Sequence, residues 1–165
     1  MLLSPIQNGA SFGLGGWKQT RPHLSQLFGK NPQIYAQFGL KGHNGIDYSG
    51  SKNSHDIFAP MQGKIIVKND KGGYGLHVRI KDKTKEVVLG HFKSLSVIDG
   101  QEVALGEKLG RMGTSGFSTG VHLHLGLRFL KNGEVVNYDN GFAGYVDPVP
   151  YMITWKGTQD ILNLA

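Results

Sequence analysis

Short apolar runs alternate with turn residues over most of the chain, a pattern typical of an all-β protein. Glycine, which favours turns, supplies 25 of the 165 residues. Strands are predicted at 63–68, 76–80, 86–89, 108–112, 122–129 and 134–136. No run of eighteen apolar residues occurs, so we expect no insertion into a membrane.

Turn residues separate the predicted strands. They lie at 70–73, 99–100, 114–116 and 131–134, and the Asn-Gly pair in the last of these predicts a β-hairpin. The charged run 81–86 also lies between two strands and is interpreted as a solvated hairpin turn. Helical signals are few; 23–28, after Pro22, and 159–164 are the best candidates.

The segment from Val121 to Leu127 carries the sharpest chemical signal. Its apolar and other residues alternate with a period of two, so His122 and His124 project from one face of a strand. Val121, Leu123, Leu125 and Leu127 then face the other way. Burying two imidazoles in a core is costly, so a functional pair is favoured over two hydrogen-bonded core histidines.

A second polar cluster, His43-Asn44-Gly45-Ile46-Asp47, lies about eighty residues earlier. The glycines at 42, 45 and 50 argue against a helix. On an extended stretch His43 and Asp47 share a face, and Gly45 between them would leave room for an ion. Alone this pair indicates no more than a loop hydrogen bond, but together with His-x-His it predicts a hydrolytic zinc site.

Composition narrows the chemistry. The chain has no cysteine, so a metal must be held by nitrogen and oxygen, and disulfides are excluded. The net charge of +6 suggests an anionic partner such as a membrane surface, a nucleic acid or a polyanionic cell wall, although part of it serves solubility. The charge is scattered, and no basic motif indicates nucleic acid, so none is expected as a partner.

The length is close to that of one typical domain, and no linker or long repeat is visible. The aromatic residues of the first forty positions, Phe12, Trp17, Phe28, Tyr35 and Phe38, either pack onto the sheet or form one wall of a groove. The first residues lack the pattern of a secretory signal. We therefore expect a mature form, a trimmed chain or export by another route.

Three further histidines are interpreted as surface residues. His77 alternates with Arg79 on a predicted strand and is expected at an exposed sheet position. His55 lies in a polar loop and could line a substrate groove, and His23 follows Pro22.

Taken together, these segments resemble the catalytic domain of lysostaphin-type (LytM-like) zinc endopeptidases, which cut peptide cross-links of bacterial peptidoglycan. The matching segments are 42–47, 59–60 with 63–66, 73–75, 90–91, 100–110 and 113–124. They follow the family's order, and 146–151 resembles the end of its domain. The resemblance implies an antiparallel two-sheet β-sandwich of the duplicated hybrid motif type, with few short helices and zinc on the floor of a groove.

The resemblance also implies roles that spacing alone leaves open, since both His122 and His124 could bind a metal. His43, Asp47 and His124 match the zinc ligands, and His91 and His122 match two catalytic histidines that are not ligands. The division is then a single zinc endopeptidase domain, 1–165, with a wrapping segment 1–37, a catalytic core 38–151 and a tail 152–165. The glycine-rich stretch 113–120 is either a loop that approaches substrate or a plain tight connection.

Two departures from the family pattern stand out. Val88-Leu89-Gly90 precedes His91 and Phe92 follows it, where relatives often carry an aromatic and a small residue before the histidine and leucine after it. An oxyanion-stabilising tyrosine of some relatives is not placed by the sequence, which offers Tyr35 and Tyr74 as candidates.

The function implied is zinc-dependent hydrolysis of peptidoglycan cross-links, with wall peptides as the partner and a monomer as the expected state. The alternative is a non-catalytic module of the same fold that binds wall peptides or activates another hydrolase. The expected site of action is the cell wall, extracellular or periplasmic. A phage lysin made in the host cytoplasm and an excised domain of a bacterial protein both fit.

Overall fold

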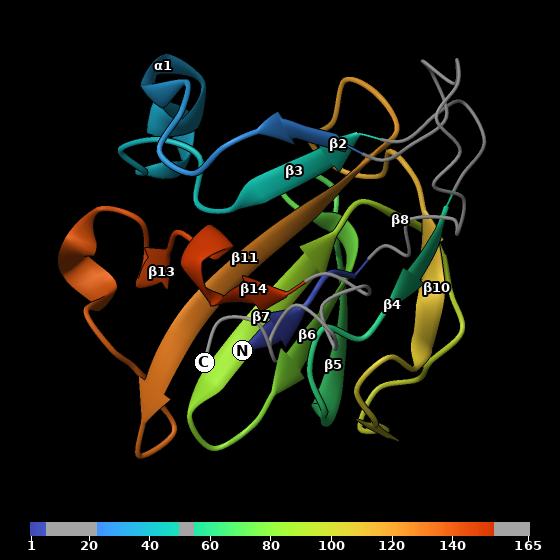
Figure 1. Ribbon diagram of the computed structural model, residues 1–165. Helices are drawn as coiled ribbons and strands as arrows, with labels where there is room; N and C mark the ends of the chain where they lie inside the picture. Colours follow the sequence, from blue (N-terminus) through green and yellow to red (C-terminus); the bar gives the residue numbers. More distant parts are fainter. Residues whose placement is uncertain (6–22, 50–54, 154–165) are drawn as a thin grey trace, which may run out of the picture.

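The computed structural model describes residues 1–5, 23–49 and 55–153, and in them two antiparallel sheets face each other (Figure 1). The larger sheet has the strand order β2-β3-β11-β7-β6-β5-β9. Its strands are β2 (His23–Gln26), β3 (Ile46–Ser49), β5 (Gly63–Asp70), β6 (Gly75–Lys81), β7 (Lys85–Gly90), β9 (Glu102–Val103) and β11 (His122–Lys131). The mostly-β antiparallel architecture expected from the sequence is confirmed.

The smaller sheet and several short elements complete the described chain. Its order is β4 (Asp56–Phe58), β10 (Lys108–Met112) and β8 (Phe92–Leu95). β12 (Glu134–Val135) and β13 (Tyr145–Val146) both pair with β11, and β1 (Leu2–Leu3) pairs in parallel with β14 (Met152–Ile153). The helical turns are α1 (Pro32–Tyr35), η1 (Ala36–Phe38), η2 (Tyr138–Asn140) and η3 (Val149–Tyr151).

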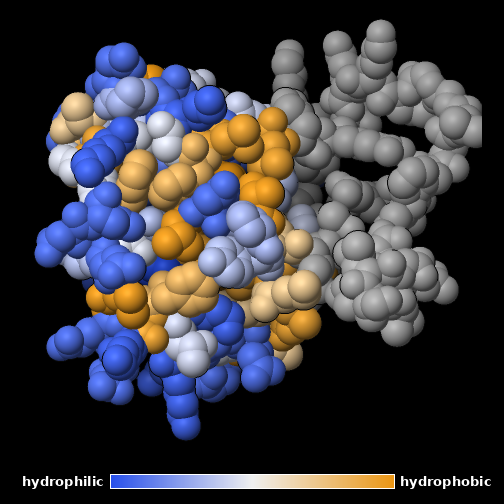
Figure 2. Space-filling model, turned by 60° about the vertical axis from the view of Figure 1, so that its left-hand side comes forward, coloured by the Kyte–Doolittle hydropathy of each residue, from blue (hydrophilic) through white to orange (hydrophobic). Residues whose placement is uncertain are grey.

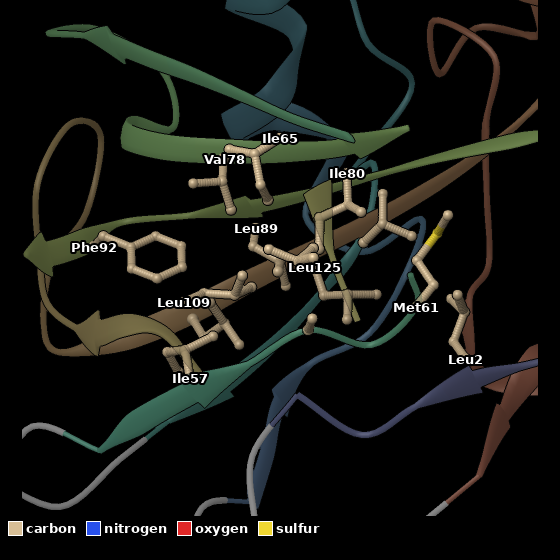
Figure 3. Close-up of a cluster of buried hydrophobic side chains, with 14 of the residues drawn as sticks. Leu2, Ile57, Met61, Ile65, Val78, Ile80, Leu89, Phe92, Leu109 and Leu125 are labelled. Atoms are coloured by element: carbon tan, nitrogen blue, oxygen red, sulfur yellow. The ribbon is translucent and has the colours of Figure 1, made fainter. Parts of the chain in front are cut away.

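The hydrophobic core lies between the two sheets (Figure 3). Alternate side chains of β11, β7 and β6 enter it and meet side chains of the smaller sheet. The fully buried members include Val78, Ile80, Val87, Leu89, Leu123, Leu125 and Leu127 opposite Ile57, Leu109 and Met112. Each such side chain contributes about 1.5–3 kcal/mol of transfer free energy. Because strand side chains alternate, this burial turns the intervening polar residues to the opposite face.

The strands predicted from periodicity are all present, with ends that differ by at most two residues. The helix predicted at 23–28 is wrong, because His23–Gln26 is strand β2, paired with β3 through Leu24 opposite Tyr48. A helix of six residues is marginal by itself, whereas the edge of β3 offers backbone partners. The real helical turn follows Asn31, with Pro32 in its first turn. The helix expected at 159–164 lies outside the described residues.

Two predicted turns deserve comparison with their geometry. Asn132 and Gly133 both have left-handed backbones, with φ of 54° and 84°, as a tight hairpin turn requires, so the hairpin between β11 and β12 is confirmed. The turn between β6 and β7 is organised by Asp82, whose Oδ1 accepts hydrogen bonds from the amides of Thr84 and Lys85. Its Oδ2 lies 2.7 Å from Lys85 Nζ.

Within the described ranges, no helix is long and apolar enough to cross a membrane. Figure 2 shows one face of the molecule, on which patches of apolar residues lie between hydrophilic ones. The large apolar side chains that are exposed include Leu24, Leu27, Ile34, Phe38 and Phe117. Several of them lie beside the site described below.

Replacing Asp82 with Asn should destabilise the protein by about 1 kcal/mol near neutral pH. Burial raises the pKa of Asp82, but the hydrogen bonds and Lys85 outweigh this and bring it down to about 2. Because the folded pKa is lowered, this stabilisation is present above about pH 4 and is lost as the pH falls toward about 2. Chemical denaturation of both proteins at several pH values measures it.

The exposed Asp139, replaced with Asn, is the matched control for removing one carboxylate. A difference between wild type and the Asp82 variant that does not shrink between pH 4 and pH 2 would contradict the assignment.

Candidate metal centre

Strand pairing brings distant polar residues into one row on the face of the large sheet away from the core. β3 pairs with β11 so that Asp47 lies opposite His124, and β11 pairs with β7 so that His124 lies opposite Gly90. His91 follows Gly90 directly, and His122 lies two residues before His124 on the same face. Strand pairing therefore brings together four of the five residues that the sequence singled out, and the fifth, His43, contacts Asp47.

Three of them place one atom each around a common point. His43 Nε2 and His124 Nδ1 are 2.9 Å apart, and each lies 3.1 Å from Asp47 Oδ1. All three residues are buried. Among the described residues, these are the group of three that could hold a metal ion. Tetrahedral nitrogen and oxygen ligands of zinc lie about 3.3 Å from one another, so this spacing fits one small cation.

The protonation of the three residues suits the same ion. Burial raises the pKa of Asp47, but its hydrogen bonds and charge interactions with His124 and His43 outweigh burial and hold the pKa well below the usual range. Burial lowers the pKa of His124, despite its contact with Asp47. His43 Nδ1 lies 3.3 Å from the carbonyl oxygen of Leu27 and can donate its proton there. One carboxylate and two imidazoles are a zinc ligand set.

Gly45 makes this packing possible. A Cβ atom at Gly45 would lie 2.6 Å from His124 Cε1 and 2.4 Å from the carbonyl oxygen of Leu125. The sequence suggested that Gly45 leaves room for an ion, and this is wrong in detail, because the space is occupied by the ring of His124. No other residue type lets the imidazole lie here without moving the strand.

His91 and His122 stand beside the centre with their rings 4.4 Å apart. His91 Nδ1 donates to the carbonyl oxygen of Ser115 at 2.7 Å, and His122 Nδ1 lies 2.9 Å from the carbonyl oxygen of Gly120. Each ring thus has its Nδ1 proton engaged, which leaves Nε2 as the acceptor in the neutral form. His122 Nε2 lies 3.8 Å from Asp47 Oδ2 and so faces the centre.

The environment of His91 is unusual for a histidine. It is buried and has a left-handed backbone, with φ of 65°. Burial and the neighbouring His122 lower the pKa of His91 to about 4. The loop 113–120 supplies the carbonyl groups that orient both histidines, so it is more than a plain connection.

The five residues line a groove of about 640 Å³. One wall comes from α1 and η1, with Tyr35 and Phe38, and another from Phe117 in the glycine-rich loop. The rings of Phe38 and Phe117 touch with centroids 5.3 Å apart. The expectation that N-terminal aromatic residues form a wall of a groove therefore holds for Tyr35 and Phe38. Phe12 and Trp17 lie outside the described residues.

The two candidate tyrosines differ in their surroundings. The Tyr35 ring lies 5.0 Å from that of His43, and burial together with the charge of Asp47 raises the pKa of Tyr35 to about 12. The hydroxyl of Tyr74 accepts a hydrogen bond of 2.6 Å from Asn44 Nδ2, and its ring packs on His124 at 4.9 Å. Both tyrosines line the groove, Tyr35 with a retained proton beside His43 and Tyr74 packed on the ring of His124.

The remaining histidines fall elsewhere. The exposed position predicted for His77 is wrong, because His77 is buried under Tyr74, with ring centroids 5.4 Å apart. Its Nδ1 donates to the carbonyl oxygen of Gly75. His55 is half-buried and is not among the residues that line the groove. His23 begins β2.

Comparison with known proteins agrees with this geometry. The family model of peptidase family M23 matches residues 41–138, more than half of the chain. A metalloprotease of Haemophilus influenzae is 31% identical over 136 residues, which are 79% of this chain and 28% of that protein. The DD-carboxypeptidase/endopeptidase Mpg of Neisseria meningitidis is 38% identical over 96 residues, 58% of this chain and 21% of its own length.

Solved structures show the same fold. The catalytic domain of the prophage-encoded M23 protein EnpA from Enterococcus faecalis superposes with a TM-score of 0.58 at 30% identity, covering 81% of this chain and 96% of that domain. The lysostaphin catalytic domain from Staphylococcus simulans has a TM-score of 0.63 at 22% identity, covering 79% and 91%. This chain spans about a quarter of the curated relatives that it matches. By its family match, its fold and its groove residues, the chain belongs to peptidase family M23.

Proposed function

We propose that the protein is a zinc-dependent endopeptidase that hydrolyses peptide cross-links of bacterial peptidoglycan. The observation that carries the proposal is the convergence of His43, Asp47 and His124 on one point, with His91 and His122 beside it in a groove. The printed names of relatives support it, since one is a DD-carboxypeptidase/endopeptidase and another an antimicrobial peptidase. The catalytic core is proposed to lie within 38–151.

In this proposal His43, Asp47 and His124 hold the zinc ion. When bound, zinc lowers the pKa of water and polarises a scissile carbonyl. Asp47 supplies the one negative charge of the ligand set, which would leave the centre at a net charge of +1, and Gly45 and Tyr74 fix the position of the His124 ring.

His91 and His122 carry the proton transfers. Their Nε2 atoms accept the proton of the attacking water and later return it to the leaving amine. The carbonyl groups of Ser115 and Gly120 hold each Nδ1 proton, so neither ring can rotate without losing a hydrogen bond. No glutamate is needed as base. The hydroxyl of Tyr35 retains its proton and is placed to donate to the oxyanion that develops on the carbonyl.

The proposed site of action is the bacterial cell wall, on the extracellular or periplasmic side. Relatives from Histophilus somni and Haemophilus influenzae are named outer membrane antigenic lipoprotein B. A lysin role in a phage is compatible with the same activity. A non-catalytic module that binds wall peptides is the alternative that the first experiment separates.

Zinc-loaded protein should release peptide-cleaved fragments from purified peptidoglycan, and a chelator should abolish the release until zinc is restored. Mass spectrometry of the products identifies the bond. Sacculi of two cross-link types, one with glycine bridges and one with direct cross-links, serve as parallel substrates. Zinc binding with no cleavage of either type would favour the non-catalytic module.

Replacing His91 or His122 with Ala should retain about one zinc per chain and lower kcat by about 10²–10⁴-fold, because the proton acceptor is lost while the ligands remain. His124→Ala should lose the zinc as well. Metal analysis of the purified variants and turnover on a cross-linked peptide distinguish the two effects. Full activity of His122→Ala would refute its role.

Replacing Tyr35 with Phe should lower kcat by about 10–10³-fold, with little change in KM or zinc content, because the lost hydroxyl acts on the developing charge. Tyr151→Phe, which removes an exposed hydroxyl outside the groove, is the matched control. An unchanged kcat for Tyr35→Phe would leave oxyanion stabilisation to other groups.

A further inference from the structure

Two arginines that the proposed mechanism does not use line the same groove as the metal centre. They are Arg79 of β6 and Arg128 of β11. Both contact the buried carboxylate of Glu86, with Arg79 Nη1 at 2.8 Å and Arg128 Nη2 at 2.7 Å from Oε1. Two positive charges thus share one negative charge in a mostly buried cluster.

Most of the donors of these arginines are not used by Glu86. A guanidinium has five N–H groups, of which Arg79 directs one and Arg128 two toward Oε1. Arg79 Nε is buried and has no hydrogen-bond partner among the described residues. A buried guanidinium that retains free donors and excess charge is suited to a carboxylate, which accepts two parallel hydrogen bonds.

The position of the cluster relative to the metal centre is fixed by β11. His124 and Arg128 are four residues apart on one face of the strand, a distance of about 13 Å. Between them Gly126 has no side chain, and the ring of Tyr145 packs against it. The Arg128 guanidinium lies over that ring, 5.1 Å from its centroid, which limits its orientation.

Arg79 lies in the row of Gly126, because Arg79 pairs with Val88 and Val88 pairs with Gly126. It is therefore closer than Arg128, along the strand direction, to the row of the metal ligands. Asp70 also lines the groove, but its Oδ1 accepts hydrogen bonds from the amides of Gly73 and Gly75. Among the described residues that line the groove, Arg79 and Arg128 are its lysine or arginine side chains, and so its permanent positive charges.

We infer that Arg79 and Arg128 form a subsite that binds a carboxylate of the substrate peptide. An extended peptide covers about 13 Å in about four residues, so the carboxylate belongs to the same stem peptide as the scissile bond. The preferred substrate class is then a stem peptide with free carboxylates rather than an uncharged oligoglycine bridge. The assignment of substrate rests on the proposed function, whereas the binding of the carboxylate does not.

The test measures binding without turnover. Isothermal titration of zinc-loaded His122→Ala uses the stem tetrapeptide L-Ala–γ-D-Glu–diaminopimelate–D-Ala in four forms. One has all three carboxylates free, and the others are amidated at the terminal D-Ala, at diaminopimelate or at the α-carboxyl of D-Glu. The free form should bind at least about tenfold more tightly than one of the amidated forms, and the weaker one identifies which carboxylate is bound.

The preference should fall below about twofold when Arg79→Gln is added to this protein. Lys81→Gln is the matched control, because it removes the same charge from the same strand at a residue outside the groove, and it should leave the preference unchanged. Arg128→Lys keeps the charge but not the paired donors and should also reduce the preference. It serves if Arg79→Gln does not fold, as judged by circular dichroism.

Equal affinity for all four peptides overturns the subsite, as does a preference that survives both arginine substitutions. If neither variant folds, the comparison of the four peptides on the parent protein decides alone. Failure of the proposed hydrolase appears differently, as absence of cleavage by the zinc-loaded protein with His122 intact while the carboxylate preference persists.

Discussion

The structure depends on the pairing of β11 with β3 on one side and β7 on the other. Leu123, Leu125 and Leu127 enter the core from one face of β11, and this burial fixes the register of the strand. His122, His124 and Arg128 are then obliged to lie on the other face. A slip of one residue would place imidazoles in the core and leucines in the groove, so the energetics of folding hold the candidate site together.

Burying the polar side chains of His43, Asp47 and His124 costs solvation free energy, which their hydrogen bonds and packing contacts offset in part. Asp47 accepts a hydrogen bond from Nδ1 of His124, the carbonyl oxygen of Leu27 accepts one from Nδ1 of His43, and Tyr74 covers one side of His124. His124 Nε2 nevertheless remains buried without a partner among the described residues. A bound cation would make the convergence of His43 Nε2, His124 Nδ1 and Asp47 Oδ1 favourable. Without a cation, these three atoms have few protons to share in hydrogen bonds.

Much of the candidate site could be predicted from the sequence, because the alternation of apolar and polar residues shows which side chains share a face of a strand. His-x-His on an alternating segment defines a face without knowledge of the partner strands. The position of Tyr35 beside His43, and the cluster of Arg79 with Glu86 and Arg128, could not be found this way, because each arises from tertiary contacts that the periodicity of one strand does not encode. His77 shows the same limit: its alternation was correct, but its burial depends on Tyr74 in the turn that precedes β6, whose ring packs on it. Residues 23–26 were missed as a strand for a similar reason. They are a strand because they pair with the edge of β3, and the local sequence does not reveal this pairing.

The positive charges behind the net charge of +6 differ in what they can do, because some are exposed and others are mostly buried. Exposed lysines are screened by solvent and salt over about 10 Å, so they steer an anionic polymer without choosing between its bonds. The charges of Arg79 and Arg128 lie largely out of water, where a carboxylate of a bound peptide would interact with them more strongly and at a fixed distance from the proposed metal ligands. Because His124 and Arg128 belong to the same strand, the proposed metal centre and the proposed carboxylate subsite would keep a fixed distance from each other. A change of substrate class within this fold would then come from two groups of side chains: those that follow His124 along β11, and their neighbours on β6 and β7. The proposed metal ligands would stay the same.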